Sequence, residues 1–379
     1  MIPVFKPSYG QEEVNAVARV LESGWTGLGP EVAKFEEEFA HYIGVEYAVA
    51  TNSGTAALHL AVEGLPATDT RELVITTPLT FVSTNHAILL GGKKPYFCDV
   101  EPDTLNLDPD SIPEHALVNA CAIMCVHFGG HSCDMYKLRN LADKYDLKII
   151  EDAAHACGGK YYWEMLGSMG DVGCFSFHAV KNLSCGSGGM LTTNHKTVYE
   201  RARSLRWVGI DKSTWDRSDG TYAWEYDVTE LGYNYYMNDI SAAIGRIQLE
   251  KLEDANLTRG ALADRYTHAF DTSSYEHDSW FPATPVTHHY ATSAWHNYVI
   301  KVPARDALHL MLKDLMIGSS VHYKPNTLYS TYSAHQEPCP VAMDAWSKIL
   351  TLPLYPGLSL EDQDLIINAV LDHTETCRA

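Results

Sequence analysis

The sequence predicts an α/β protein in which helices sandwich a mostly parallel sheet and a smaller α+β C-terminal domain follows. Short apolar strands alternate with amphipathic helices over about the first 195 residues, a pattern typical of a parallel sheet covered on both faces. The chain has 379 residues, whereas single hydrophobic cores stop growing near about 250–300 residues. We therefore expect a large domain over residues 1–250, including the N-terminal segment, and a small domain over residues 251–379.

Two amphipathic helices are expected before the first strand. Residues 11–23 carry apolar side chains at helical spacing, and Gly24 follows as a helix stop. Residues 30–43 repeat this pattern after Pro30, whose ring suits the first turn of a helix.

The sheet is expected from strands and helices that alternate along the chain. The expected strands cover residues 47–50, 73–76, 95–98, 122–126 and 148–150, and the helices between them cover residues 56–63, 80–91 and 134–145. Residues 173–177 and 189–192 predict a hairpin-like pair of strands around a loop. Beyond them the sequence predicts a long loop over 207–236, a helix over 238–261 and a strand over 298–302.

Composition argues against several classes of protein. Hydrophobic residues make up 46% of the chain and charged residues 20%, which is ordinary for a globular protein and argues against disorder. The net charge of -20 argues against binding to nucleic acid or to an anionic membrane, because both require basic patches. An anionic ligand would therefore have to be held by backbone amides, helix ends or a few placed cations.

The expected compartment is the cytoplasm. Residues 1–7 lack the apolar run of a signal peptide, and no stretch reaches the about 18 apolar residues of a membrane span. The nine cysteines, an odd number without paired spacing, are typical of reduced thiols. Cys121 and Cys125 would alternate onto one face of their strand and belong to the core.

Four polar or glycine-rich clusters follow the expected strands. They cover residues 52–55, 80–84, 152–155 and 176–189. In parallel sheets, ligands bind outside the carboxyl ends of the strands. We therefore expect these clusters to meet at one functional site.

Lys181 and Asp152 are the candidate catalytic pair. Lys181 lies in a stretch rich in aromatic residues and poor in charge, where desolvation would lower its pKa and favour Schiff-base formation. Asp152 ends an apolar strand. The pair suits pyridoxal 5'-phosphate (PLP), which needs a lysine for an imine and a carboxylate to keep its pyridine nitrogen protonated. Taken separately, Asp152 could be a helix cap and Lys181 a solvated surface lysine.

Ser53, Gly54 and Thr55 supply what the phosphate of this cofactor needs. They open a helix after a strand, where free backbone N–H groups and the positive end of the helix dipole favour an anion. An ordinary capped helix start would have the same sequence. The cofactor interpretation therefore depends on these residues occurring together with Asp152 and Lys181.

The chain resembles the sugar aminotransferases of the DegT/DnrJ/EryC1/StrS family, which belong to the fold type I group of PLP enzymes. The resemblance covers nearly the whole chain and rests on the order and spacing of several segments. They are residues 24–30, 52–59, 80–84, 151–155, 175–189, 232–240 and 352–356. The implied fold is that of a fold type I PLP-dependent transferase.

The resemblance implies roles for the cofactor residues. Lys181 would form the Schiff base and move protons, Asp152 would pair with the pyridinium, and His155 would hydrogen-bond the phenolic oxygen. Phe81 would stack on the ring. The phosphate would be held by Ser53, Gly54, Thr55 and Ser176 and, from the neighbouring subunit, by Asn234. This last contact implies a homodimer with shared active sites.

The resemblance also implies contacts with the substrate, and here alternatives stay open. The expected contacts are Trp25, Thr26 and Gly27, with His322, Tyr323 and Lys324 in a segment that closes over the sugar in relatives. A plain strand end is the alternative for residues 322–325. Residues 207–209 depart from the Asn-His-Gly that relatives commonly carry. In the stretch that follows, Lys212 and Arg217 could contact a diphosphate or be solvated charges.

No metal site is predicted. Residues 127–133 contain histidines and a cysteine that can ligate zinc. Their glycines would break a helix, so the helical face that a zinc site of this kind needs is absent.

The implied reaction moves an amino group from L-glutamate, through pyridoxamine 5'-phosphate (PMP), onto a keto sugar, expected to be a nucleotide-linked keto-deoxy hexose. A cyclitol or a higher-carbon keto sugar acid would be an alternative acceptor. A PLP/PMP-dependent sugar dehydratase is a further alternative, but those relatives typically carry histidine where this chain has Lys181. A regulator without turnover is disfavoured because the acidic chain has no basic helix for DNA.

Overall fold

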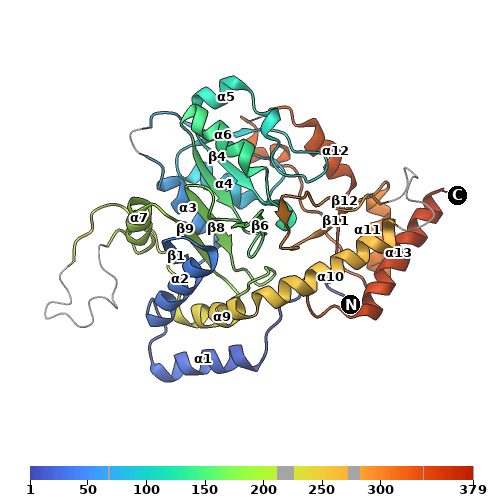
Figure 1. The fold of residues 1–379 in the computed structure, drawn as a ribbon, viewed down its shortest axis with the longest axis horizontal. Coiled ribbons are helices and arrows are strands. Elements are labelled where there is room, and N and C mark those ends of the chain that lie inside the picture. Colours follow the sequence, from blue (N-terminus) through green and yellow to red (C-terminus); the bar gives the residue numbers. More distant parts are fainter. Residues whose placement is uncertain (67–68, 211–225, 272–281, 336, 379) are drawn as a thin grey trace.

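A seven-stranded sheet forms the centre of the molecule (Figure 1). The computed structural model describes all residues except 67–68, 211–225, 272–281, 336 and 379. The strand order is β1-β9-β8-β5-β4-β2-β3, with bounds β1 Tyr47–Thr51, β2 Leu73–Thr76, β3 Lys94–Phe97, β4 Ala120–Val126, β5 Lys148–Asp152, β8 Val172–Ser176 and β9 Gly189–Thr193. β9 runs antiparallel to both of its neighbours, and the other adjacent pairs are parallel. The predicted mostly parallel sheet is confirmed.

Helices cover both faces of this sheet (Figure 1). On one face lie α2 (Pro30–Ile43) and α6 (Met135–Tyr145), which contribute Phe35, Phe39 and Leu138 to the core. On the other face lie α3 (Gly54–Glu63), α4 (Val82–Leu90) and α7 (Lys196–Arg206), which bury Leu58, Ile88 and Leu205. The short helix α5 (Glu114–Asn119) precedes β4, and α1 (Gln11–Ser23) packs against α9 (Asp239–Glu250).

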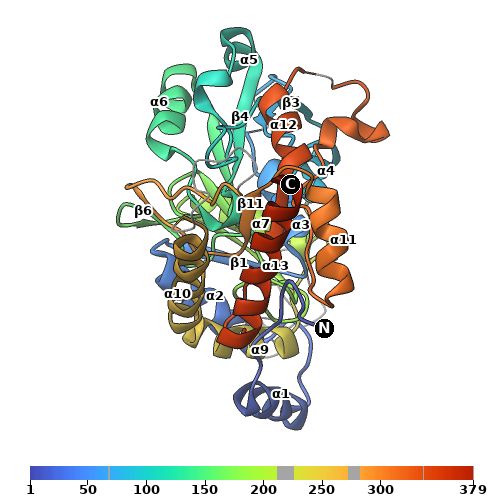
Figure 2. The same cartoon turned by 90° about the vertical axis from the view of Figure 1, so that its right-hand side faces the viewer.

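The C-terminal part has its own core, built on a two-stranded antiparallel sheet (Figure 2). Its elements are α10 (Leu252–Asp271), β11 (Tyr298–Lys301), α11 (Arg305–Asp314), α12 (Pro340–Lys348), β12 (Ile349–Leu352) and α13 (Leu360–Arg378). The N-terminal residues join this part, since Ile2 forms a bridge with Ile317. The predicted domain boundary at residue 250 remains a prediction.

Smaller elements complete the described chain. A three-stranded sheet consists of β6 (Lys160–Tyr161), β7 (Glu164–Met165) and β10 (Ala291–Thr292). Single turns of 3-10 helix cover Pro109–Ser111, Phe128–Gly130, Asn326–Leu328 and Ser330–Tyr332.

Two local expectations were wrong. The helix expected over 238–261 is interrupted at Lys251, because α9 packs on α1 and α2 whereas α10 packs on α13. Cys121 and Cys125 do not share one face. The register between β2 and β4 shifts at Cys121, which lies between the paired residues Ala120 and Ala122, and such a bulge turns the following side chains to the other face.

Three further expectations concern membrane spans, the cysteines and the loop over 207–236. No helix in the described parts of the chain is long and apolar enough to cross a membrane. The eight described cysteines are buried and free. Within the expected loop over 207–236, Trp207 bridges to Asn234, whereas Lys212 and Arg217 lie outside the described residues.

Candidate active site

Side-chain contacts bring the four polar clusters together at the carboxyl ends of the strands. Thr84 Oγ1 donates a 2.7 Å hydrogen bond to Asp152 Oδ2, which joins the second cluster to the third. A Cβ added at Gly54 would lie 2.9 Å from Ser176 Cβ, so the first and fourth clusters are in contact. Thr55 Oγ1 donates to Ser83 Oγ at 2.7 Å, which joins the first cluster to the second, so the four clusters meet at one site.

Asp152 is a buried carboxylate with a hydrogen-bond donor on each oxygen. Thr84 Oγ1 donates to Oδ2, and the Ala154 N–H donates to Oδ1 at 3.1 Å. Burial raises the pKa of Asp152, whereas these two donors and the charge of Lys181 lower it. Burial has the larger effect, so the pKa of Asp152 is raised overall, and a cation bound opposite the carboxylate would stabilise its charged form.

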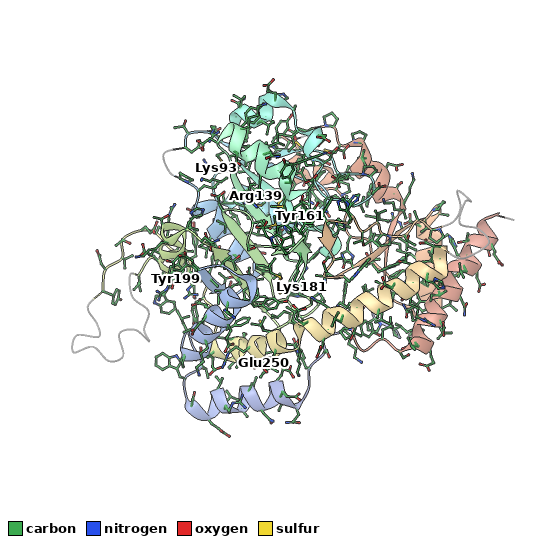
Figure 3. All side chains as sticks on the ribbon, in the orientation of Figure 1. Lys93, Arg139, Tyr161, Lys181, Tyr199 and Glu250 are labelled. Atoms are coloured by element: carbon green, nitrogen blue, oxygen red, sulfur yellow. The ribbon has the colours of Figure 1, made fainter. Side chains whose placement is uncertain are left out.

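Lys181 lies in the loop between β8 and β9, facing the space between the sheet and the helix pair α9–α10 (Figure 3). The loop is closed by backbone hydrogen bonds from Phe177 N–H to Gly188 O and from Ala179 N–H to Gly186 O. Desolvation lowers the pKa of the Lys181 amine to about 8, and the Asp152 charge opposes this shift. A larger fraction of neutral, nucleophilic amine is thus available near neutral pH than on a solvated lysine.

The neighbouring Asn182 locks the position of this loop. Its Nδ2 donates to Ala294 O at 2.6 Å and to Asn256 Oδ1 at 2.8 Å, so both amide protons are used. Asn182 Oδ1 lies 3.1 Å from His296 Nδ1 and must accept from it. The proton on Nδ1 leaves Nε2 of the neutral His296 as an acceptor.

His155 is oriented by backbone and by a distant tyrosine. The Gly129 N–H donates to His155 Nδ1 at 3.3 Å. Burial and the charge of Lys181 hold the pKa of His155 well below its usual value, so the ring is neutral. Its remaining proton is therefore on Nε2, which lies 2.9 Å from Tyr323 Oη. His155 thus presents a hydrogen-bond donor on the side of Tyr323.

The start of α3 forms a cradle against β8. Ser53 caps the helix, since its Oγ accepts from the Ala56 N–H at 3.1 Å. The capped-helix alternative is therefore present, but capping occupies only one donor of the first turn and leaves others for an anion. Thr55 Oγ1 donates to Ser83 Oγ, and Gly54 lies too close to Ser176 for a side chain.

Phe81 and Asn234 lie at exposed edges of the site. The Phe81 side chain is 57% exposed, and its ring centroid lies 6.1 Å from that of Tyr323. Asn234 is exposed, and its backbone oxygen accepts from Asn52 Nδ2 at 3.2 Å, next to the cradle. The roles assigned to both residues remain predictions.

The six expected substrate residues separate into different places. Tyr323 meets His155, and His322 Nδ1 lies 2.8 Å from Thr351 Oγ1. Lys324 is exposed, with its amine 5.0 Å from the centre of the Tyr329 ring. Trp25, Thr26 and Gly27 precede α2 on the loop after α1; Trp25 Nε1 donates to Leu28 O, and Gly27 O accepts from the Asp239 N–H.

These residues fit PLP. Asp152 would hold the protonated pyridine nitrogen, His155 would donate to the phenolic oxygen, and Lys181 has the lowered pKa that imine formation requires. The cradle beside Ser176, which a Cβ at Gly54 would fill, suits a phosphate at a helix N-terminus.

The chain matches the DegT/DnrJ/EryC1/StrS aminotransferase family over residues 7–371. It belongs to this family. The spore coat polysaccharide biosynthesis protein SpsC of Bacillus subtilis is 40% identical over 384 residues, which cover 98% of this chain and 96% of SpsC.

Solved structures agree with this family membership. The sugar aminotransferase CalS13 from Micromonospora echinospora superposes with a TM-score of 0.88 and 31% identity, covering 98% of this chain and 100% of CalS13. The candidate sugar aminotransferase Spr1654 from Streptococcus pneumoniae, in its PMP form, gives a TM-score of 0.91 and 28% identity over 99% and 100% of the two chains. The protein is a PLP-dependent sugar aminotransferase with the fold type I architecture.

Sequence reasoning left several residues of the aminotransferase site without a role. Thr84 and Asn182 lie within the recognised segments, and their positions before Asp152 and after Lys181 were the available signal. His296 and Arg259 come from segments that carried no signal at all. The histidines of residues 127–133 have other contacts. His127 Nε2 lies 2.9 Å from the buried Glu151 carboxylate, and His131 Nε2 accepts from the His288 N–H at 3.0 Å.

Proposed function

We propose that this aminotransferase moves the amino group of L-glutamate onto a nucleotide-linked keto-deoxy hexose, and that it acts as a homodimer with shared active sites. The observation that carries the proposal is the Lys181 amine, whose pKa is lowered to about 8 in a site that also contains the buried Asp152. A lysine at this position favours transamination over sugar dehydration, because a dehydratase of this family typically lacks it.

Each polar group would have a separate task. PLP, when bound, supplies a carbonyl carbon that takes up the amino group and a ring that withdraws electrons. Lys181 would hold the cofactor covalently and then carry a proton to and from the substrate carbon. Asp152 would keep a proton on the pyridine nitrogen. The Nε2–H of His155, which lies 2.9 Å from Tyr323 Oη, would be shared between that hydroxyl and the phenolic oxygen.

The similarity to SpsC supports an acceptor carried on a nucleotide. SpsC is named for the biosynthesis of a spore coat polysaccharide, and sugars enter polysaccharides from activated donors that carry a leaving group. The exposed Lys324 and the partly buried Tyr323 offer a cation and a hydroxyl at the edge of the site, which suit a phosphorylated sugar. A cyclitol or a higher-carbon keto sugar acid remains the alternative acceptor.

The position of Asn234 supports shared active sites. Its side chain is exposed beside Asn52, directly before the phosphate cradle, where it is free to meet a second subunit. We propose that it reaches the cofactor phosphate of the partner.

The acceptor is tested by incubating the purified holoenzyme with L-glutamate and a panel of keto compounds. The panel contains 3-keto and 4-keto-6-deoxy hexoses on different nucleotides, a keto cyclitol and a keto sugar acid. We expect 2-oxoglutarate and an amino sugar nucleotide to form together, with no product from Lys181→Ala and normal product from the exposed control Lys348→Ala. Amination confined to the cyclitol or the sugar acid, or full activity of Lys181→Ala, would contradict the proposal.

Shared sites are tested by mixing two inactive variants. Lys181→Ala and Asn234→Ala are unfolded together and refolded, so that mixed dimers form. If the sites are shared, each mixed dimer regains one intact site, and about a quarter of the wild-type activity should return on random mixing. If each subunit builds its own site, the mixture should stay as inactive as its components.

A further inference from the structure

We propose that Arg259 binds a carboxylate of the amino donor in a cavity that it shares with Lys181. The inference rests on the transamination proposed above and names the residue that recognises the donor. It follows from an unpaired buried cation, from the cavity beside it and from the charges around that cavity.

Arg259 is a buried cation for which the described residues provide no partner. It lies in α10 with an exposed fraction of 5%. Its Nε and Nη1 have no hydrogen-bond partner, and no ion pair of its guanidinium occurs among the residues that the structure describes. Desolvation lowers the pKa of Arg259 to about 10, so the side chain remains charged at neutral pH. A buried charge is unfavourable unless a counter-charge or hydrogen bonds compensate it, and an anionic ligand would supply both.

The cavity next to Arg259 reaches the reactive lysine. It has a volume of about 240 Å³ and is lined by Lys181, Asn182 and Arg259, with Pro7 and Ser8 from the N-terminal segment. Figure 3 shows Lys181 next to the α9–α10 helix pair, which carries most of the remaining lining; Pro356 completes it. A ligand in this space can therefore approach the amine and the guanidinium together.

Lys251, a further cation of this cavity, is already neutralised. Lys251 Nζ lies 2.7 Å from Glu13 Oε1 and 3.2 Å from Glu12 Oε2. Gln248 is also engaged, since its Nε2 donates to Ser8 O and to Glu13 Oε1. Among the described residues, Arg259 is thus a cation of the cavity, besides Lys181, whose hydrogen-bonding capacity and charge are still available.

The shared cavity places Arg259 on the side of the reacting lysine, since both residues line it. Burial holds the pKa of His296 well below its usual value, and Lys181 and, more weakly, His155, His322 and Arg259 act in the same direction. His296 in turn is held by Asn182, the neighbour of Lys181. Lys181 and Arg259 are two cations that line one cavity of a chain with a net charge of -20, and such a local pair can attract an anion. The lining also contains an acidic residue, Asp254, which is exposed to solvent.

A carboxylate of a small donor fits better than the acceptor's phosphates. The cavity is smaller than the about 300 Å³ at which pockets for drug-sized ligands begin, and a nucleotide sugar is larger than such a ligand. A guanidinium also matches a carboxylate through two parallel hydrogen bonds. The phosphate of the cofactor is expected at Gly54 and Ser176, at a different part of the site.

The test separates the two halves of the reaction in the holoenzyme. The first half is followed as the loss of visible absorbance when L-glutamate converts the PLP form to the PMP form. For Arg259→Met we expect the L-glutamate concentration giving half-maximal rate to rise about 30-fold or more, as for loss of a charge-assisted pair. Arg259→Lys, which keeps the charge but not the planar fork, should show a smaller rise.

The second half provides an internal control for folding. The PMP-loaded Arg259→Met enzyme should aminate the keto sugar with wild-type rate and half-saturation. Arg265→Met is the matched control, because Arg265 lies in the same helix but is paired with Asp364 at the surface. If Arg259→Met slows the acceptor half instead, the guanidinium serves the acceptor and the inference is overturned; an unchanged L-glutamate half would overturn it equally.

A second probe keeps this outcome distinct from failure of the proposed donor. Glutarate carries two carboxylates and no amino group, so it cannot react. Calorimetry should show glutarate binding to the wild-type holoenzyme about 30-fold or more tightly than to Arg259→Met. If L-glutamate fails as a donor but glutarate still depends on Arg259, the donor assignment is wrong and the carboxylate site stands. If glutarate binds equally to the wild type and to Arg259→Met, or does not bind to the wild type, Arg259 does not form a carboxylate site.

Discussion

Thr84 Oγ1 donates to Asp152 Oδ2 at 2.7 Å, and this bond fixes the direction of a short hydroxyl relay. Thr80 Oγ1 lies 2.8 Å from Thr84 Oγ1. Because the single proton of Thr84 is given to Asp152, Thr80 must donate to Thr84. The relay stabilises the ionised carboxylate in a buried place where desolvation alone would favour its protonated form.

Removal of the Thr84 hydroxyl should weaken cofactor binding. In Thr84→Val the pKa of Asp152 should rise further, because a donor to its charged form is lost. We expect the PLP dissociation constant to rise about tenfold near neutral pH, as for loss of one hydrogen bond to a charged group, with a larger loss at lower pH as Asp152 protonates. Spectral titration of the apoenzyme measures the constant. Thr374→Val, which removes a hydroxyl that bonds within α13, should have no such effect; equal losses in the two variants would refute the relay.

The lowered pKa of Lys181 predicts the pH dependence of cofactor capture. Only the neutral amine attacks the aldehyde, so the capture rate of the apoenzyme should rise about tenfold per pH unit below pH 8 and level off above it. A free lysine side chain, with a pKa of about 10.4, would keep gaining rate over two further units. Stopped-flow absorbance measures the rate.

An Asp152 variant tests the direction in which the Asp152 charge shifts the pKa of Lys181. The Asp152 charge raises the pKa of Lys181, so Asp152→Asn should move the break in the rate profile to lower pH. A break that stays in place, or a wild-type rate still rising at pH 10, would be inconsistent with the desolvated amine.

Gly54→Ala should close the phosphate cradle. The new Cβ would meet Ser176 Cβ at 2.9 Å and Ser176 Cα at 3.2 Å, so the start of α3 must move away from β8. We expect PLP affinity to fall about tenfold, while affinity for pyridoxal, which has no phosphate, stays nearly constant. Gly357→Ala, whose Cβ would lie 4.0 Å from Tyr355, serves as the control. An equal fall in affinity for PLP and for pyridoxal would instead indicate that the variant disturbs the whole site.

Asn182→Asp should destabilise the protein. The variant places a carboxylate oxygen where the Asn182 NH2 group donates to Ala294 O and Asn256 Oδ1. Two hydrogen bonds are lost, and the carboxylate faces two carbonyl oxygens that cannot donate to it. We expect the free energy of unfolding to fall by about 1–3 kcal/mol, measured by urea denaturation. Asn119→Asp, at an exposed amide in α5, should change it by less than about 0.5 kcal/mol. Similar values for the two variants would show that Asn182 does not lock the loop.

Local elements followed from the sequence because their causes are local. The helices over 11–23 and 30–43 and the strand over 73–76 have the expected bounds, since side-chain period, caps and glycine stops act within a few residues. The break at Lys251 and the shift at Cys121 arise from packing between distant elements. Periodicity along the chain carries no information about them.

The sequence by itself determined the chemistry of this aminotransferase: a lysine, a strand-end acid and a glycine-opened helix, in an order that suits one cofactor. Tertiary structure decided how those groups are tuned. Which nitrogen of His155 carries its proton depends on Gly129 and Tyr323. Arg259 is buried in α10 beside Lys181, where the described part of the chain offers it no counter-charge. Residue types fix which reactions are available, but desolvation and hydrogen bonding depend on neighbours that only the folded chain brings together.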